Sequence, residues 1–159
     1  MTWIEVDETK IQARLTAMPA RVHDALVRKV TTLRLMLEAK IKGKLSDDVL
    51  HVRSGNLRRS IFSETLEQAT SVVGRAASSG DVKYAAIQEF GGSTRAHDIV
   101  PVKAQALAFM MGGKQVFASI VHHPGSNIPA RSYMRSSLGE MADQIVAGLK
   151  EAAGEGVRQ

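Results

Sequence analysis

Hydrophobic residues recur at intervals of three and four in two separate segments, residues 11–41 and residues 134–152, and this periodicity constrains the fold most. It is typical of amphipathic helices, because residues three and four apart share one helix face. We expect Pro19 to divide the first segment into a short helix and a longer one over residues 20–42, since its ring clashes with the preceding turn. Gly43 is placed to end that helix. The sequence thus predicts helices at both ends of the chain.

The middle of the chain changes to patterns typical of β-strands, with moderate alternation in residues 60–67 and apolar runs in residues 106–111 and 116–122. Residues 60–67 and 71–77 form one expected strand pair. Residues 106–111 and 116–122 form another, joined by the glycine-containing loop 112–114. Neighbouring strands without long crossover helices favour antiparallel pairing.

We therefore expect an α+β fold, in which an antiparallel sheet of about four strands packs with N-terminal and C-terminal helices. The 159 residues fit a single domain. Its expected parts are N-terminal helices in 1–45, a sheet region in 46–130 and a C-terminal helix in 131–154. Residues 83–90 are expected to form one helical turn before Gly91-Gly92. Ser132 is a candidate cap of the last helix, and the tail GEGVRQ is expected to fray.

Composition narrows the possible functions. The chain has no cysteine, which excludes disulfides, thiolate nucleophiles and cysteine-bound zinc. With 44% hydrophobic and 23% charged residues, it has the composition of a soluble globular protein. The start MTWIEVDETK lacks the features of a signal peptide, and no hydrophobic run is long enough to span a membrane. We expect the protein to stay in the cytoplasm where it is made.

A net charge of +5 suggests an acidic partner, although aromatic residues, at 4%, are scarce for stacking on nucleic-acid bases. The basic face of the helix between Arg21 and Lys44 is the candidate nucleic-acid surface, and a solvated helix face is the alternative interpretation. The residues of this face that could contact nucleic acid are Arg28, Lys29, Lys40, Lys42 and Lys44.

No catalytic, cofactor-binding or metal-binding site is predicted. His122 and His123 are neighbours on a strand, so they point to opposite faces and cannot readily hold one ion together. We expect His122 to pack against the sheet. The segments GGSTR and MGGK lack the spacing of a phosphate-binding loop, and no GxSxG motif occurs. A metal-dependent hydrolase built around His97, His122 and His123 is a weaker hypothesis.

Several arginines lie where the expected helices and strands connect. They are Arg53, Arg58, Arg59, Arg95, Arg131 and Arg135. Arginine is enriched at protein interfaces, where its planar fork pairs with carboxylates. Because arginines lie at these connections and no active site is predicted, we expect a role in assembly.

Four blocks of the sequence carry a resemblance. They are VRSGNLRRSI (52–61), YAAIQEFGG (84–92), HDIVP followed by ALAF (97–109) and HHPGSNIPARSYMRSSL (122–138). In this order they resemble the tail-completion proteins of tailed bacteriophages, which include the lambdoid minor tail-component family and the related virion morphogenesis proteins. Ser132-Tyr133 stands where the family pattern has a second proline and an aromatic residue.

The resemblance implies a non-enzymatic virion protein, a tail-completion, tail-terminator or neck subunit of a phage or prophage. Its copies would form a ring, a hexamer by family analogy, through a heterologous interface. The ring would cap the tail tube and join it to the head connector. The implied partners are further copies, the tail tube protein and a connector or neck protein, with genome DNA passing through the ring.

The resemblance also implies where the protein acts and which residues meet its partners. It would act in the virion tail or neck after assembly in the host cytoplasm. The loops around Gly55 and Ser93 would meet neighbouring rings. The expected interface or corner residues are Arg58, Arg59, Glu89, Phe90, Arg131 and Tyr133. A basic nucleic-acid-binding module that uses the face from Arg21 to Lys44 is the alternative function.

Overall fold

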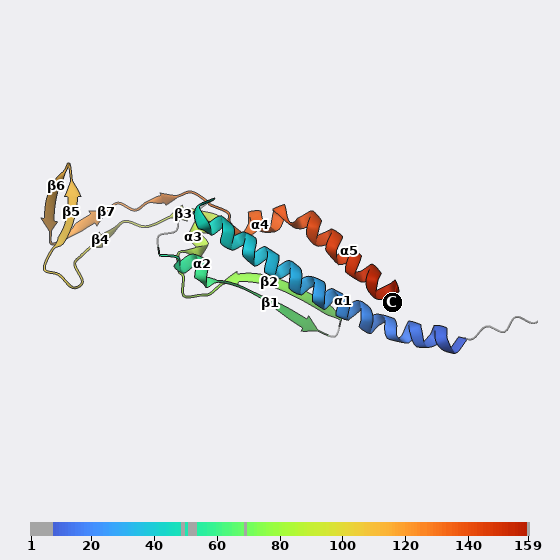
Figure 1. Cartoon of the computed structure of the whole chain (residues 1–159). Coiled ribbons are helices and arrows are strands. Elements are labelled where there is room, and N and C mark those ends of the chain that lie inside the picture. Colours follow the sequence, from blue (N-terminus) through green and yellow to red (C-terminus); the bar gives the residue numbers. More distant parts are fainter. Residues whose placement is uncertain (1–7, 49, 51–53, 69, 159) are drawn as a thin grey trace, which may run out of the picture. The chain divides into compact units, whose positions relative to one another are not determined.

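The computed structural model describes residues 8–48, 50, 54–68 and 70–158 (Figure 1). Contacts divide the chain into two compact units. The helical unit comprises the chain up to Ala85 and from Ser132 onward, and the hairpin unit comprises Ala86–Arg131. Helices at both ends and antiparallel strands between them confirm the α+β class.

The helical unit is built on one long helix, α1 (Glu8–Gly43), which a π-helical turn (Lys44–Asp48) follows. The prediction that Pro19 divides this helix is wrong, because α1 continues through Pro19. A proline inside a helix removes one backbone hydrogen bond, and the long helix tolerates this loss. The α-helical part ends at Gly43 as predicted, but the chain continues without a break into the π-helical turn.

Two strands, β1 (Ile61–Gln68) and β2 (Ser71–Ser78), pack on one face of α1, next to the short helix α2 (Asn56–Ser60). Their antiparallel register runs from Ile61 opposite Ser78 to Gln68 opposite Ser71. The guanidinium of Arg34 in α1 donates to Oγ of Ser63 over 2.9 Å and to Oγ1 of Thr65 over 2.9 Å. The side of β1 that carries Ser63 and Thr65 therefore faces the helix.

The C-terminal helices α4 (Met134–Glu140) and α5 (Ala142–Arg158) complete the helical unit. A ladder of small residues in α5 allows close packing on α1: Ala152 is buried, and a Cβ on Gly156 would lie 2.5 Å from Cα of Val22. The prediction that the tail frays is wrong for residues 154–158. These residues continue α5, and Gly156 is buried against α1. The core of the unit consists of Ile41, Leu45, Leu57, Ile61 and Tyr133.

The hairpin unit contains α3, whose bounds are Ala85–Phe90, and six short strands. Two of its ladders share one register: β3 (Gly92–Ser93) pairs with β8 (Asn127–Ile128), and β4 (His97–Ile99) pairs with β7 (Val121–His123). Between them the backbone N–H of Thr94 donates to the carbonyl of Ser126 over 2.9 Å. These segments thus form one interrupted two-stranded ladder.

The third ladder of this unit is a tight hairpin of β5 (Leu107–Met111) and β6 (Lys114–Ala118) around the turn Gly112-Gly113. The predicted strand 116–122 is interrupted at Ser119 and Ile120, because residues 100–106 stand opposite these two and the register changes there. All the strands are antiparallel as predicted, but they form two-stranded ladders and no larger sheet among the described residues. Each hairpin pairs locally within its own unit.

Candidate assembly interface

The end of α3 and the segment before α4 meet at a tight corner. The backbone N–H of Arg131 donates to the carbonyl of Gln88 over 2.8 Å, and a Cβ on Gly91 would lie 2.7 Å from the nitrogen of Ala130. Gly91 has a φ of 72°, which glycine adopts without steric cost. The blocks YAAIQEFGG and HHPGSNIPARSYMRSSL therefore touch, although about 40 residues separate them in the sequence.

Tyr133 anchors the start of α4 in the core of the helical unit. Its ring is only 1% exposed, and its hydroxyl donates to the carbonyl of Ala85 over 3.2 Å. The carbonyl of Tyr133 accepts from Oγ of the buried Ser137 over 2.6 Å. The expected cap Ser132 is replaced at the N-cap position by Tyr133, which makes no side-chain cap bond. Tyr133 is thus a corner residue that orients the chain.

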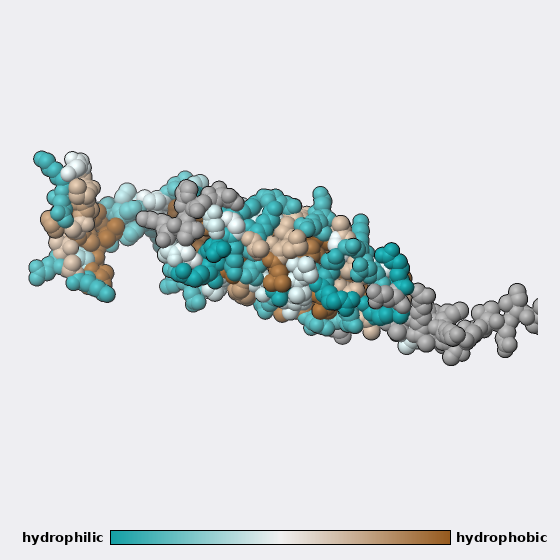
Figure 2. All heavy atoms as spheres, in the orientation of Figure 1, coloured by the Kyte–Doolittle hydropathy of each residue, from teal (hydrophilic) through white to brown (hydrophobic). Residues whose placement is uncertain are grey.

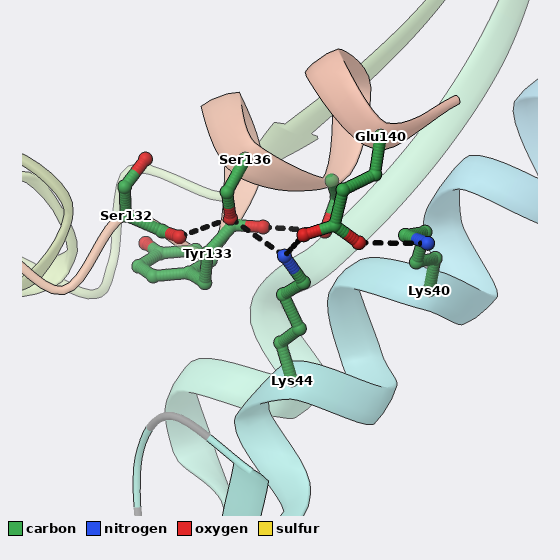
Figure 3. Close-up of polar contacts among 7 residues, drawn as sticks. Lys40, Lys44, Ser132, Tyr133, Ser136 and Glu140 are labelled. Carbon is green, nitrogen blue, oxygen red and sulfur yellow. Dashed lines mark hydrogen bonds and ion pairs between the residues drawn. The ribbon is translucent and has the colours of Figure 1, made fainter. Parts of the chain in front are cut away.

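A carboxylate clamp holds α4 against the end of α1 (Figure 3). Glu140 accepts from Nζ of Lys40 over 2.8 Å and from Nζ of Lys44, which also donates to Oγ of Ser136 over 2.7 Å. The hydrogen bond from Lys40, followed by that from Lys44, lowers the pKa of Glu140 below its ordinary value. The clamp joins two elements that lie about 100 residues apart in the sequence.

The other residues of the basic face are also engaged within the chain. Nζ of Lys29 lies 2.8 Å from a carboxylate oxygen of Glu151, and Nζ of Lys42 lies 2.5 Å from Glu38. Together with the clamp, in which Lys40 and Lys44 share Glu140, these pairs engage four of the five basic residues expected to meet nucleic acid with three carboxylates. Arg28, the fifth, is exposed.

The remaining expected interface residues differ in exposure. Arg58 and Arg59 are exposed on α2, and the guanidinium of Arg59 donates to the carbonyl of Ser54 over 3.1 Å. Arg131 is also exposed. In α3 the exposed fraction of Glu89 is 3%, whereas that of Phe90 is 61%. Four of these residues are therefore exposed enough to contact a partner directly: Arg58, Arg59, Phe90 and Arg131. Glu89 is buried and does not reach the surface.

Sequence reasoning missed a set of exposed hydrophobic side chains on the hairpin unit. Figure 2 shows hydrophobic residues at the surface of the β5–β6 hairpin. The most exposed are Val102 at 92%, Met110 at 67%, Met111 at 66% and Phe117 at 65%. Residues 92–131 are all described, and none of them is buried. The run ALAFMM (106–111) could have indicated this surface. Consecutive hydrophobic residues are typical of a strand that other elements cover on both faces.

The histidines lie on the β4–β7 ladder. The rings of His97 and His123 stack with centroids 5.1 Å apart on one face, and Nδ1 of His122 lies 2.8 Å from Oδ1 of Asp98 on the other. The prediction that His122 packs against the sheet is wrong, because its side chain is exposed beside Asp98. In the part of the chain that the structure describes, no three His, Asp or Glu side chains form a group suited to a metal ion.

None of the helices in the described ranges is both long and apolar enough to cross a membrane. Comparison of the chain with protein-family models, with curated proteins and with solved structures finds no match.

Proposed function

We propose that this protein is a structural subunit of a tailed-phage virion, a tail-completion or neck protein whose copies form a ring between the tail tube and the head connector. One observation supports this most: the hairpin unit exposes large hydrophobic side chains and has no buried residue between Gly92 and Arg131. A surface of this kind is typical of a chain that completes its fold against other subunits.

The contacts between the resemblance blocks support the phage assignment in particular. The blocks YAAIQEFGG and HHPGSNIPARSYMRSSL make the Gln88–Arg131 hydrogen bond and the close approach at Gly91. VRSGNLRRSI supplies Leu57 and Ile61 to the same core cluster as Tyr133. Residues of the blocks that resemble the tail-completion family thus hold the corners of this fold, which is expected if the family's architecture is preserved.

The nucleic-acid hypothesis ranks second. Affinity for duplex DNA comes mainly from lysine and arginine side chains that neutralise phosphates. Here Lys29, Lys40, Lys42 and Lys44 are already paired with carboxylates. We expect no salt-dependent binding of duplex DNA through this face, as measured by fluorescence anisotropy at low ionic strength.

The proposed function is tested by deleting the gene from the phage or prophage that carries it. We expect electron microscopy of the lysate to show filled heads and separate tails, or tails of abnormal length, because the ring that joins them is missing. A plasmid copy of the chain should restore joined particles. Infectious particles of normal morphology without the gene product would refute the proposal.

A further inference from the structure

The β5–β6 hairpin has two faces of different exposure. Side chains alternate along each strand, so Leu107, Phe109 and Met111 share a face with Val116 and Ala118. Leu107, Val116 and Ala118 are half-buried, whereas Phe109 is 37% and Met111 66% exposed. The opposite face, which we call the hairpin face, consists of Ala108, Met110, Gln115 and Phe117, and all four residues are exposed. Hydrophobic residues on both sides of a strand pair are typical of strands that lie between two layers.

The amount of exposed hydrophobic surface fits an interface. Residues 99–120 expose large hydrophobic side chains: Ile99, Val100, Val102, Phe109, Met110, Met111, Phe117 and Ile120. At roughly 200 Å² for each fully exposed side chain, they present about 900 Å² in total. These side chains lie on both faces of the hairpin and on the segments next to it, so the total covers more than one patch. The total is close to the roughly 800 Å² that one partner contributes to a standard interface.

A second uncovered face lies on β1–β2 in the helical unit. Ser63 and Thr65 point to α1, so Phe62, Leu66 and their neighbour Val73 lie on the other side, which we call the outer face. These three side chains are 39–46% exposed. An ion pair between Glu64 and Arg75 lies between them on the same face.

We propose that the hairpin face of one copy packs on the outer face of β1–β2 in the next copy. This inference rests on the proposed ring. A ring closes through a heterologous contact, in which two different patches of the same chain meet. Both uncovered sheet faces carry large hydrophobic side chains, with Gln115 at the turn end of the hairpin face and the Glu64–Arg75 ion pair in the middle of the outer face. Two sheet faces pack about 10 Å apart, which lets their side chains interdigitate.

The matching areas also favour a second copy as the partner. Met110 and Phe117 expose roughly 260 Å², and Phe62, Leu66 and Val73 expose roughly 250 Å². One such contact is smaller than the roughly 1,000 Å² of a stable complex. Each subunit of a closed ring makes the contact twice, so the assembled ring is much more stable than an isolated pair.

Cysteine cross-linking tests the contact, because the natural chain has no cysteine and gives no background. Tagged Phe117→Cys chains are mixed with untagged Leu66→Cys chains at high concentration under mild oxidation. A disulfide needs Cα atoms within about 7 Å and traps even a weak contact. We expect heterodimers on non-reducing gels at several times the yield of the control mixture of Phe117→Cys with Lys150→Cys, whose cysteine is exposed on α5.

A second pair, Met110→Cys with Val73→Cys, guards against a local effect of one substitution, and circular dichroism checks that each variant is folded. Heterodimer yields no higher than the control for both pairs would overturn the contact. So would predominant Phe117→Cys homodimers, which would place hairpin against hairpin. A failed cross-link with a tail-joining defect on deletion refutes this contact alone. A successful cross-link with normal particles after deletion refutes the phage role alone.

Discussion

The close packing of α5 on α1 predicts that two nearby glycines respond oppositely to the same substitution. A Cβ on Gly156 would lie 2.5 Å from Cα and 2.8 Å from the nitrogen of Val22. These are backbone atoms of a long helix and cannot move aside as a flexible side chain can. A Cβ on Gly154 meets only the guanidinium tip of Arg158, at 3.6 Å. Gly154→Ala is therefore the matched control for Gly156→Ala.

The magnitudes follow from two opposing effects. Alanine in place of glycine inside a helix adds about 0.5–1 kcal/mol to stability. Forcing a methyl group into a packed contact costs about 1–3 kcal/mol. We expect Gly154→Ala to raise the free energy of unfolding by up to about 1 kcal/mol. Gly156→Ala should lower it by about 0.5–2 kcal/mol, because the steric cost exceeds the gain in helix propensity.

Urea denaturation followed by circular dichroism measures both free energies. Gly148→Ala provides an intermediate case, since its Cβ would touch Cδ of Lys29 at 3.4 Å, and that side chain can adjust. We expect the order of stability to be Gly154→Ala, then Gly148→Ala, then Gly156→Ala. A Gly156→Ala variant as stable as Gly154→Ala would show that α5 does not approach α1 at this point.

Three further predictions concern single side chains. Gly125→Ala should lower local stability by about 1–3 kcal/mol, because φ is 90° and the Cβ would lie 2.4 Å from the carbonyl oxygen of Thr94. Limited proteolysis should detect faster cleavage within residues 92–131, and unchanged cleavage would contradict this prediction. Glu140→Gln should make the melting temperature fall less steeply with acidification below pH 4.5, because the folded-state pKa of Glu140 is lowered and the stabilisation of the wild-type clamp is lost as the pH falls through it; parallel melting curves would refute this. Tyr133→Phe should lower the free energy of unfolding by about 1 kcal/mol through loss of the hydrogen bond to Ala85, and a variant of wild-type stability would count against that bond.

Local pattern was sufficient to predict most of the secondary structure. The strands observed at Ile61–Gln68 and Ser71–Ser78 lie within one residue of the predicted ones, and the predicted turn at 83–90 is α3. Tertiary contact explains the failure at the C-terminus. The C-terminal turn of α5 is helical because Gly156 packs against Val22, a contact that the periodicity of α5 does not contain.

The candidate interface was less accessible to sequence reasoning. The sequence predicted a strand at 106–111 that pairs with the next strand, and the pairing of β5 with β6 confirms this. The exposure of Met110 and Phe117 could not be predicted, because it depends on which elements fail to cover the hairpin. The ion pairs of Lys29 and Lys40 could not be predicted from the sequence either. Their partners, Glu151 and Glu140, lie about 100 residues or more away in the sequence.

The central claim is that this chain is a structural part of a phage particle. Quantitative mass spectrometry of purified particles from a host that carries the gene tests it most directly. We expect the chain to be present in every joined particle at the copy number of a single ring, far below that of the tail tube protein. Its absence from purified infectious particles would contradict the account.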